Sequence, residues 1–233
     1  MLLGIAGMVG SGKTTLARAL ASRFGLQLAI ESVDDNPWLE TFYASPENMR
    51  AYALHLQLHF LAARFASMRR MRGLGGSWVV DRTWYEDAEV FAAGLHEQGL
   101  LSTEEWQLYR RLYTELLYAP AARPPRLLIY LHAPLETILA RIAERGRPKE
   151  RDAERSYWEQ LHARYARWIG VFRQCPVLFI DVREYDLVAE PSAAAEGIAS
   201  RVRQRLEREL PQTELWPAVQ PGQANSSSFV GFA

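Results

Sequence analysis

The chain has 233 residues, and its 27 Lys and Arg residues are balanced by 27 Asp and Glu residues, so the formal net charge is zero. This balance argues against a protein that coats nucleic acid, because such proteins usually carry a clear basic excess. Apolar residues make up 48% of the chain and charged residues 23%, a composition that is typical of globular proteins and excludes a disordered chain.

The cysteine content and the N-terminal segment indicate the cellular compartment of the protein. Cys175 is the only cysteine, so no disulfide can form within the chain, which fits a reducing compartment. The segment MLLGIAGMVG has no basic part and is interrupted by glycines, so it predicts neither a signal peptide nor a membrane span. We therefore expect a cytoplasmic protein that binds neither membranes nor nucleic acid.

Short apolar strands alternate with helices along the chain. Strands are predicted at residues 2–6, 26–30, 78–80, 127–131 and 177–180, and helices at residues 13–24, 46–72, 84–97, 103–118, 134–145, 153–173 and 191–210. The alternation predicts an α/β fold with a mostly parallel sheet that is buried on both faces. Ligands of such sheets bind at the carboxyl ends of the strands, where this chain carries Glu31, Asp81 and Asp181.

The chain is expected to form one domain followed by a tail. No internal repeat or linker interrupts residues 1–210. Residues 211–233 contain Pro217, Pro221 and a run of serines, and no charged side chain occurs from Leu215 onward. This composition predicts a mobile tail, and docking of its apolar end remains open as the alternative.

The segment GMVGSGKT matches the phosphate-binding pattern G-x-x-x-x-G-K-[ST] between a predicted strand and a predicted helix. Glycines let successive backbone N–H groups point at a phosphate, and the helix N-terminus adds its dipole. The alternative is a glycine-rich turn with an exposed lysine. Lys13 would reach the β- and γ-phosphates and Thr14 would ligate Mg²⁺. The residues expected to bind ATP here are Gly7, Gly10, Ser11, Gly12, Lys13, Thr14 and Thr15.

Missing motifs and the length of the chain exclude several classes of phosphate-binding protein. A GTPase would need the guanine-reading pattern Asn-Lys-x-Asp, which this chain lacks. An ATPase of the transporter or motor type would be larger. A small P-loop kinase remains, in which the acceptor lies over the same edge of the sheet.

Two strand ends predict the chemistry at the acceptor. A carboxylate at Glu31 would repel the anionic acceptor of a nucleoside monophosphate kinase, whereas a neutral hydroxyl acceptor needs a base such as Glu31. Asp81 stands where a Mg²⁺-side carboxylate is expected, and Arg82 would hold Glu31 ionised and contact the transferring phosphoryl group. The alternatives are a solvated glutamate at Glu31 and an ordinary surface ion pair at Asp81-Arg82.

A basic segment at the end of a predicted helix resembles the lid of a phosphoryl-transfer enzyme. Arg141 and Arg145 are four residues apart and share a helix face, and Arg147 follows in the loop. Arginines on a mobile segment stabilise negative charge as it develops, so all three are catalytic candidates, and Arg141 and Arg145 are expected to contact ATP. The alternative is a solvated basic helix end that the helix dipole favours.

Gln57 and Arg64 predict a site that reads a base. They are seven residues apart on a largely apolar helix, so they share a face and stand about 10 Å apart. Both need polar partners in such surroundings. Gln57 can bond an adenine edge through one donor and one acceptor, and Asp87 can pair with Arg64. The alternative is a buried structural salt bridge.

Together these motifs resemble the deoxynucleoside kinase family, over a stretch from the P-loop to about residue 190. The segments that carry the resemblance are Gly7–Thr14, Glu31–Glu40, Leu56–Phe65, Asp81–Asp87, Arg141–Glu150 and Ser156–His162. The resemblance implies a P-loop kinase fold with a five-stranded parallel sheet wrapped by helices, a short arginine-rich lid and a homodimer formed through helices. No counterpart of the tail is known in the family.

The resemblance also implies roles for individual residues. Glu31 resembles the general base for the 5′-hydroxyl, and Gln57, Arg64 and Asp87 fall on base-reading positions. Tyr43 resembles the tyrosine that packs against the sugar, and Glu150 resembles a second contact to the 3′-hydroxyl. The segment Tyr185-Asp186-Leu187-Val188 resembles the loop beside the ATP adenine.

The resulting hypothesis is an ATP- and Mg²⁺-dependent deoxynucleoside 5′-kinase of nucleotide salvage. Arg64 with Asp87 favours purine deoxynucleosides, allows deoxycytidine and disfavours thymidine, whose O4 offers no donor to Asp87. A nucleoside monophosphate kinase of the thymidylate type and a regulatory module that binds ATP without transferring its phosphate remain as alternatives.

Overall fold

A single parallel sheet forms the centre of the computed structural model, which describes residues 1–30, 35–147, 153–185, 187 and 190–209. Its strands are β1 (Leu2–Gly7), β2 (Gln27–Ala29), β3 (Trp78–Asp81), β4 (Leu127–His132) and β5 (Val177–Asp181). They pair in the order β2-β3-β1-β4-β5, and every pairing is parallel. The predicted five-stranded α/β fold is confirmed, and each strand agrees with its prediction to within one residue at either end.

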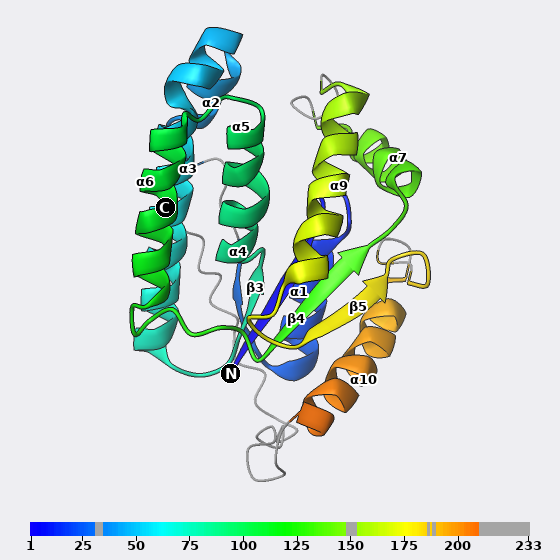
Figure 1. Ribbon diagram of the computed structural model, residues 1–233. Helices are drawn as coiled ribbons and strands as arrows, with labels where there is room; N and C mark the ends of the chain where they lie inside the picture. Colours follow the sequence, from blue (N-terminus) through cyan, green and yellow to red (C-terminus); the bar gives the residue numbers. More distant parts are fainter. Residues whose placement is uncertain (31–34, 148–152, 186, 188–189, 210–233) are drawn as a thin grey trace.

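Helices cover both faces of the sheet and are seen in Figure 1. They are α1 (Lys13–Phe24), α2 (Leu39–Tyr43), α3 (Pro46–Leu74), α4 (Trp84–Glu86), the π-helix η1 (Asp87–Ala92), α5 (Ala93–Glu97), α6 (Thr103–Leu117), α7 (Leu135–Arg145), α9 (Arg155–Val171) and α10 (Pro191–Glu209). Helix α10 packs against α1 and β5, α9 packs against η1 and α7, and α3 packs against α6. No helix in the described ranges is long and apolar enough to span a membrane.

Local sequence signals account for where the long helices begin. Ser45 accepts a hydrogen bond from the Asn48 backbone N–H at 3.2 Å, and Pro46 occupies the first turn of α3. Ser102 and Glu105 form a reciprocal capping box at the start of α6, with distances of 3.2 and 2.6 Å. The short helix α2 carries no such signal and was not predicted.

The predicted helix over residues 84–97 has the right extent but the wrong internal geometry. Its middle is the π-helix η1, which is followed by a bond from the Ala93 N–H to the Ala88 carbonyl, five residues back. Such wider turns alter the direction of side chains and are frequent at functional sites. Because apolar spacing averages over several turns, it does not reveal one wide turn, and Asp87 lies at the start of this one.

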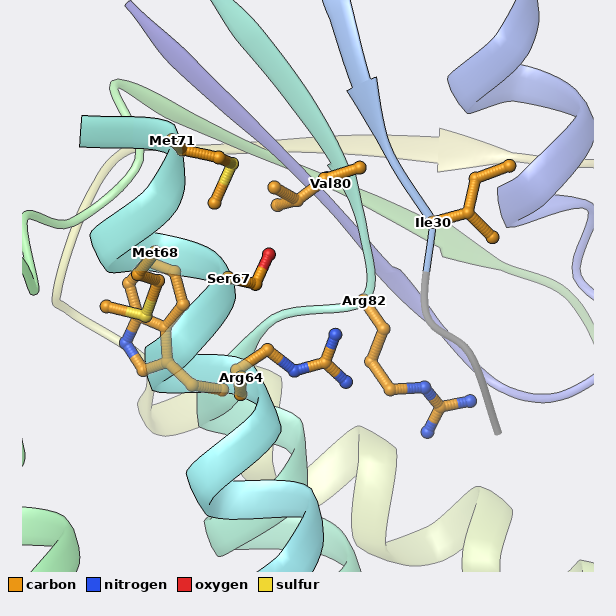
Figure 2. A pocket seen from close by; sticks show the side chains of 9 residues that line it. Ile30, Arg64, Ser67, Met68, Met71, Val80 and Arg82 are labelled. Atoms are coloured by element: carbon orange, nitrogen blue, oxygen red, sulfur yellow. The ribbon is translucent and has the colours of Figure 1, made fainter. Parts of the chain in front are cut away.

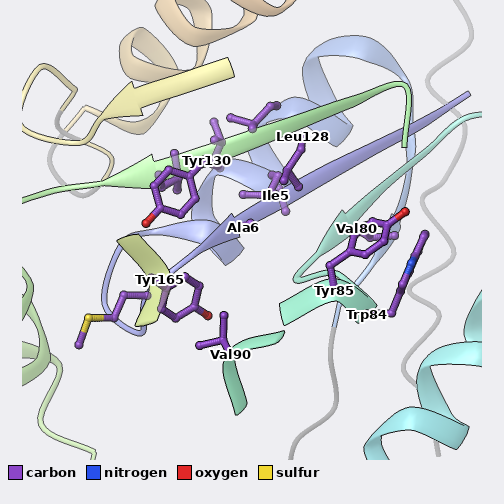
Figure 3. Close-up of a cluster of buried hydrophobic side chains, with 14 of the residues drawn as sticks. Ile5, Ala6, Val80, Trp84, Tyr85, Val90, Leu128, Tyr130 and Tyr165 are labelled. Carbon is purple, nitrogen blue, oxygen red and sulfur yellow. The ribbon is translucent and has the colours of Figure 1, made fainter. Parts of the chain in front are cut away.

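The core lies on both faces of the central strand β1 and its neighbour β4. Leu3, Ile5, Leu128 and Ile129 have no exposed surface. Each such side chain stabilises the fold by about 1.5–3 kcal/mol relative to an exposed one. Figure 3 shows how aromatic side chains from α4 and α9 join this core, among them Trp84 and Tyr165. The central strands are therefore held rigidly, and the loops at their carboxyl ends start from fixed positions.

Candidate active site

The P-loop lies at the carboxyl end of β1, between the ends of β3 and β4. Gly7, Gly10 and Gly12 have φ angles of 145°, 80° and 93°, a region that side chains strongly disfavour. A Cβ atom at Gly7 would lie 2.5 Å from the Leu131 carbonyl oxygen, which no small shift would relieve. These glycines are therefore required for the curled loop that precedes α1.

The interior of the P-loop is suited to an anion. Helix α1 has no side-chain cap and no acidic residue in its first turn, so its N-terminal N–H groups face the loop without a competing carboxylate. The Lys13 ammonium group spans the loop and donates to the carbonyls of Gly7 and Met8 at 2.8 and 3.0 Å. The Ser11 hydroxyl is buried and has no hydrogen-bond partner within the described ranges. The buried polar groups of the loop therefore fit a phosphate.

A hydroxyl and a carboxylate meet at the next strand end, and both belong to residues predicted as magnesium ligands. Thr14 donates its hydroxyl proton to the Asp81 carboxylate, and Asp81 ends β3 with 5% of its surface exposed. Among the described residues, no three His, Cys, Asp or Glu side chains gather to form a metal cage. Magnesium in kinases commonly takes few protein ligands and completes its shell with phosphates and water, so Thr14 and Asp81 suit that ion. Thr15 follows in α1.

Arg82 turns sharply away from β3. Its φ angle is 73°, and it is the only residue other than glycine with a positive φ in the described part of the chain. The Arg82 N–H donates to the Ile5 carbonyl at 2.9 Å, and the guanidinium group lies 4.5 Å from the centre of the Phe91 ring. Left-handed backbone costs an arginine about 1–3 kcal/mol and is concentrated at functional sites. The Asp81-Arg82 segment therefore forms a tight backbone turn at the end of β3 and is not a surface ion pair.

Two of the three base-reading candidates, Arg64 and Asp87, are in direct contact, and Arg64 shares a cavity with Arg82. The Arg64 guanidinium and the Asp87 carboxylate form an ion pair at 2.9 Å, with side-chain exposures of 12% and 4%. Gln57 is buried on the same helix, and its side-chain oxygen has no hydrogen-bond partner within the described ranges. The predicted Arg64–Asp87 pair is confirmed as a contact. A buried amide oxygen without a protein partner, seven residues before Arg64 on α3, fits a site that takes a polar ligand.

A small cavity lies next to both the base-reading candidate Arg64 and the phosphoryl-side candidate Arg82. Its volume is about 20 Å³, enough for a water molecule, and Arg64, Ser67 and Arg82 are among its lining residues. Figure 2 shows the Arg64 and Arg82 side chains directed into the same space, beside the ends of β2 and β3. The base-reading side and the phosphoryl side of the predicted acceptor site therefore meet between α3 and the sheet.

The lid candidates occupy the end of α7 and the residues after it. Arg141 is half-buried and donates to the Val182 carbonyl at 3.1 Å, while Arg145 and Arg147 are exposed. The helix ends at Gly146, whose φ is 66°. A Cβ atom at Gly10 would lie 2.9 Å from Ile142, so α7 packs directly on the P-loop. Arg141 is therefore on a helix that touches the phosphate site.

The remaining predicted residues lie on α2, on the segment before α10 or outside the described residues. Tyr43 ends α2 with 55% of its surface exposed, and its ring meets Phe42 edge-on at 4.9 Å. The Tyr185 ring packs on Gly197 of α10, and neighbouring Leu187 packs on Gly12 of the P-loop. The segment that resembles the adenine loop is thus in contact with the phosphate site. Glu31, Glu150 and Asp186 lie outside the described residues.

Sequence reasoning missed two buried residues at this site, Glu86 and Tyr165. The Glu86 carboxylate has no exposed surface and bonds to Gly7, Thr83 and Tyr165. The pattern Thr83-x-x-Glu86 is a capping-box signal, so Glu86 could have been found as a helix-start residue. No sequence pattern would have connected it to Gly7 or Tyr165, because both contacts span 79 residues.

Comparison with known proteins supports one family. Residues 3–207 match the family model described as deoxynucleoside kinase. A deoxyadenosine/deoxycytidine kinase of Bacillus subtilis is 40% identical over 86% of this chain and 91% of its own length. A deoxyadenosine kinase of Dictyostelium discoideum is 35% identical over 84% of this chain and 77% of its own length. The structure of deoxyadenosine kinase from M. mycoides with bound dCTP, at 24% identity, shares the fold with a TM-score of 0.72 over 88% of this chain and all of that one.

Proposed function

We infer the function of this protein from the premise that the chain belongs to the deoxynucleoside kinase family. It is a phosphotransferase that transfers the γ-phosphoryl group of ATP to the 5′-hydroxyl of a deoxynucleoside and releases the 5′-monophosphate and ADP. The observation that carries this proposal is the cluster at one sheet edge. The P-loop at the end of β1 and the Arg82 turn at the end of β3 lie at the same edge of the sheet, and Arg64, which pairs with Asp87, lines a cavity together with Arg82.

The donor side of the reaction is assigned to the P-loop and α7. Gly7, Gly10, Ser11, Gly12 and Thr15 bind ATP phosphates through the loop and the start of α1. Lys13 would exchange its bonds to the Gly7 and Met8 carbonyls for phosphate oxygens. Arg141 approaches from α7, which packs on Gly10, and Arg145 and Arg147 follow from the same helix end. Thr14 and Asp81 would hold Mg²⁺, which would supply positive charge to neutralise the phosphates.

The acceptor side is assigned to Glu31, Arg82 and the base-reading residues. Glu31 takes the proton of the 5′-hydroxyl, whose oxygen then forms the new bond to the γ-phosphorus as the bond to the ADP oxygen breaks. Arg82 contacts the phosphoryl group and keeps Glu31 ionised. Tyr43 and Glu150 are assigned to the sugar, and Tyr185 and Asp186 to the adenine of ATP.

The base preference is proposed to follow from the Arg64–Asp87 pair and Gln57. Arg64 offers N–H donors, Asp87 offers an acceptor, and the Gln57 amide supplies one of each. Adenine, guanine and cytosine each carry an exocyclic amine that can donate to the Asp87 carboxylate. Thymine presents only O4 at that position, so a buried carboxylate would lose its donor. Purine deoxynucleosides are therefore favoured, deoxycytidine is accepted and thymidine is poor.

A dimer formed through α3 and α6 is part of the proposal. Leu108 and Leu112 lie one turn apart on α6 and are 49% and 40% exposed. Ala62 and Ala66 on α3 are also exposed, and their small side chains allow close helix approach. In Figure 1, α3 and α6 lie next to each other at one side of the molecule, away from the P-loop. An apolar stripe on paired helices suits a second copy of the same chain.

The test is ATP-dependent phosphorylation of deoxyadenosine, deoxyguanosine, deoxycytidine and thymidine, measured side by side. A deoxynucleoside monophosphate product establishes the reaction, and thymidine is expected to have the lowest kcat/KM. If deoxynucleoside monophosphates are phosphorylated and deoxynucleosides are not, the thymidylate type of kinase replaces this proposal. ATP binding without any product would instead favour a regulatory module. Thymidine as the best substrate would refute only the base-reading assignment.

A further inference from the structure

We propose that Glu86 is a positioning residue whose carboxylate holds the P-loop and the Arg82 turn in one fixed relative arrangement. It would thereby set the position of the donor phosphates relative to Arg82, the arginine that is proposed to contact the transferring phosphoryl group. The inference rests on the proposed function, because it concerns the geometry of phosphoryl transfer. Glu86 is separate from Glu31, Asp81 and Asp87, to which the reaction and the recognition of substrate are assigned.

Glu86 collects donors from three separate parts of the chain. One carboxylate oxygen accepts from the Gly7 N–H at 3.3 Å and from the Tyr165 hydroxyl at 3.0 Å. The other accepts from the Thr83 N–H at 2.8 Å and the Thr83 hydroxyl at 3.3 Å. Gly7 opens the P-loop, Thr83 follows Arg82, and Tyr165 belongs to α9. One buried side chain therefore connects the donor site, the acceptor turn and a helix that follows the lid.

The surroundings of Glu86 act on its protonation in opposite directions. Burial has the largest effect and raises the pKa of the Glu86 carboxyl, while the nearby positive charges of Arg82 and Lys13 and the bonds from the Thr83 and Gly7 N–H groups partly oppose that rise. A carboxylate can accept from all four donors at once, whereas a neutral acid must use one oxygen to donate. The four donors that converge on Glu86 therefore match the acceptor capacity of a carboxylate.

The Arg82 turn depends on these supports. Arg82 has a φ of 73°, and such a residue keeps that conformation only where its surroundings impose it. Thr83 is fixed by the capping box with Glu86, and its methyl group sits on Gly4, where a Cβ atom would lie only 2.9 Å away. The Arg82 guanidinium donates to the Tyr165 hydroxyl at 3.4 Å, and that hydroxyl donates in turn to Glu86. Glu86 therefore supports the backbone next to Arg82 through Thr83 and the Arg82 side chain through the Tyr165 hydroxyl.

Two variants and one matched control test this role. Glu86→Gln keeps the size of the side chain but replaces one acceptor by an amide NH₂, and Tyr165→Phe removes only the hydroxyl between Arg82 and Glu86. The control is Tyr130→Phe. Tyr130 is also buried, its ring centroid lies 6.5 Å from that of Tyr165, and it has no hydroxyl bond to Glu86 in the described structure.

We expect Glu86→Gln to lower kcat by about 100-fold and Tyr165→Phe by about tenfold, because misplacement of reacting groups lowers the rate of the chemical step. The KM values for ATP and deoxynucleoside are expected to stay within about threefold of wild type, since the binding contacts themselves remain. A merely structural role would reduce the amount of folded protein without this separation of kcat from KM. Tyr130→Phe should leave kcat unchanged.

A second readout does not depend on turnover. In ¹⁵N-labelled protein the Gly7 amide resonance is expected to move in Glu86→Gln and to stay in place in Tyr130→Phe. An unmoved Gly7 resonance in folded Glu86→Gln overturns the proposal, as does a kcat within about threefold of wild type in both test variants. Absence of kinase activity in the wild-type enzyme would instead refute the proposed function, and the resonance would then decide the Glu86 contact alone.

Discussion

Breaking the Arg64–Asp87 pair should damage both stability and base selection. Asp87→Ala removes a carboxylate that is 4% exposed and lies 2.9 Å from the Arg64 guanidinium. The guanidinium group then keeps its buried position without this counter-charge. Loss of one partner of a buried ion pair typically destabilises a protein by about 3–5 kcal/mol, far more than loss of a surface pair.

The same substitution has a calculable effect on melting temperature and on substrate choice. For a chain of this size, roughly 2–4 °C of Tm accompanies each kcal/mol, so the loss predicts a fall of about 6–20 °C. A hydrogen bond from a base amine to a carboxylate contributes about 1.5–3 kcal/mol, which corresponds to roughly 10- to 150-fold in kcat/KM for deoxyadenosine. Thymidine, which has no amine to lose, should be affected much less.

The assay combines thermal unfolding with steady-state kinetics on wild type, Asp87→Ala, Arg64→Met and the double variant. Each single variant should be less stable than wild type. The double variant should recover part of the summed loss, because the two substitutions remove one shared interaction. The ratio of kcat/KM for deoxyadenosine to that for thymidine should fall in both single variants.

Two outcomes would contradict this reasoning. Single variants that lose less than about 1 kcal/mol would show that the pair is not an important buried interaction. A deoxyadenosine-to-thymidine ratio that stays at its wild-type value, in folded and active Asp87→Ala, would remove Asp87 from base recognition. In that case the pair would serve the packing of α3 against η1 alone.

Three further substitutions test other parts of the site. Lys13→Ala should abolish turnover and leave the unfolding midpoint close to wild type, and a folded variant with wild-type turnover would refute the role of Lys13 at the phosphates. Glu31→Gln should keep ATP affinity and lower kcat by about 10²–10⁴, the usual loss on removal of a positioned base, so near-normal turnover would exclude Glu31 as the base. Leu112→Glu should convert a dimer to a monomer in sedimentation analysis. Arg110→Glu, at another exposed position of α6, is the control and should leave the dimer intact. An unchanged dimer in Leu112→Glu would show that the interface does not include this face of α6.

Local motifs explain why much of the donor site could be predicted. Gly7–Thr14 is continuous in the chain, and its function depends on backbone N–H groups and glycine conformations that neighbouring residues determine. The strand ends at Asp81 and the capping box at Ser102 and Glu105 are likewise recognisable over a few residues, and both were confirmed. The partner of Arg64 was also predictable, since a charge on an apolar helix requires an opposite charge nearby.

The arrangement around Glu86 could not be predicted in the same way. Its carboxylate bonds to Gly7 and Tyr165 across 79 residues in each direction, and these contacts exist only because β1 lies between β3 and β4. Apolar periodicity identifies strands but does not specify their order. The left-handed turn at Arg82 and the six-residue π-helix that begins at Asp87 are short departures from regular structure, and periodicity averages over them.

The amino-acid sequence by itself determined the α/β class, the phosphate loop and the residue types available for kinase chemistry, because each follows from interactions between near neighbours in the chain. The tertiary structure alone decided which buried carboxylate connects the P-loop to the Arg82 turn and which residues of α3 meet η1. Those contacts depend on strand order and side-chain packing, where residues remote in sequence compete for the same space. Phosphate binding could therefore be predicted from one continuous segment, whereas the arrangement of the groups proposed for phosphoryl transfer depends on the whole fold.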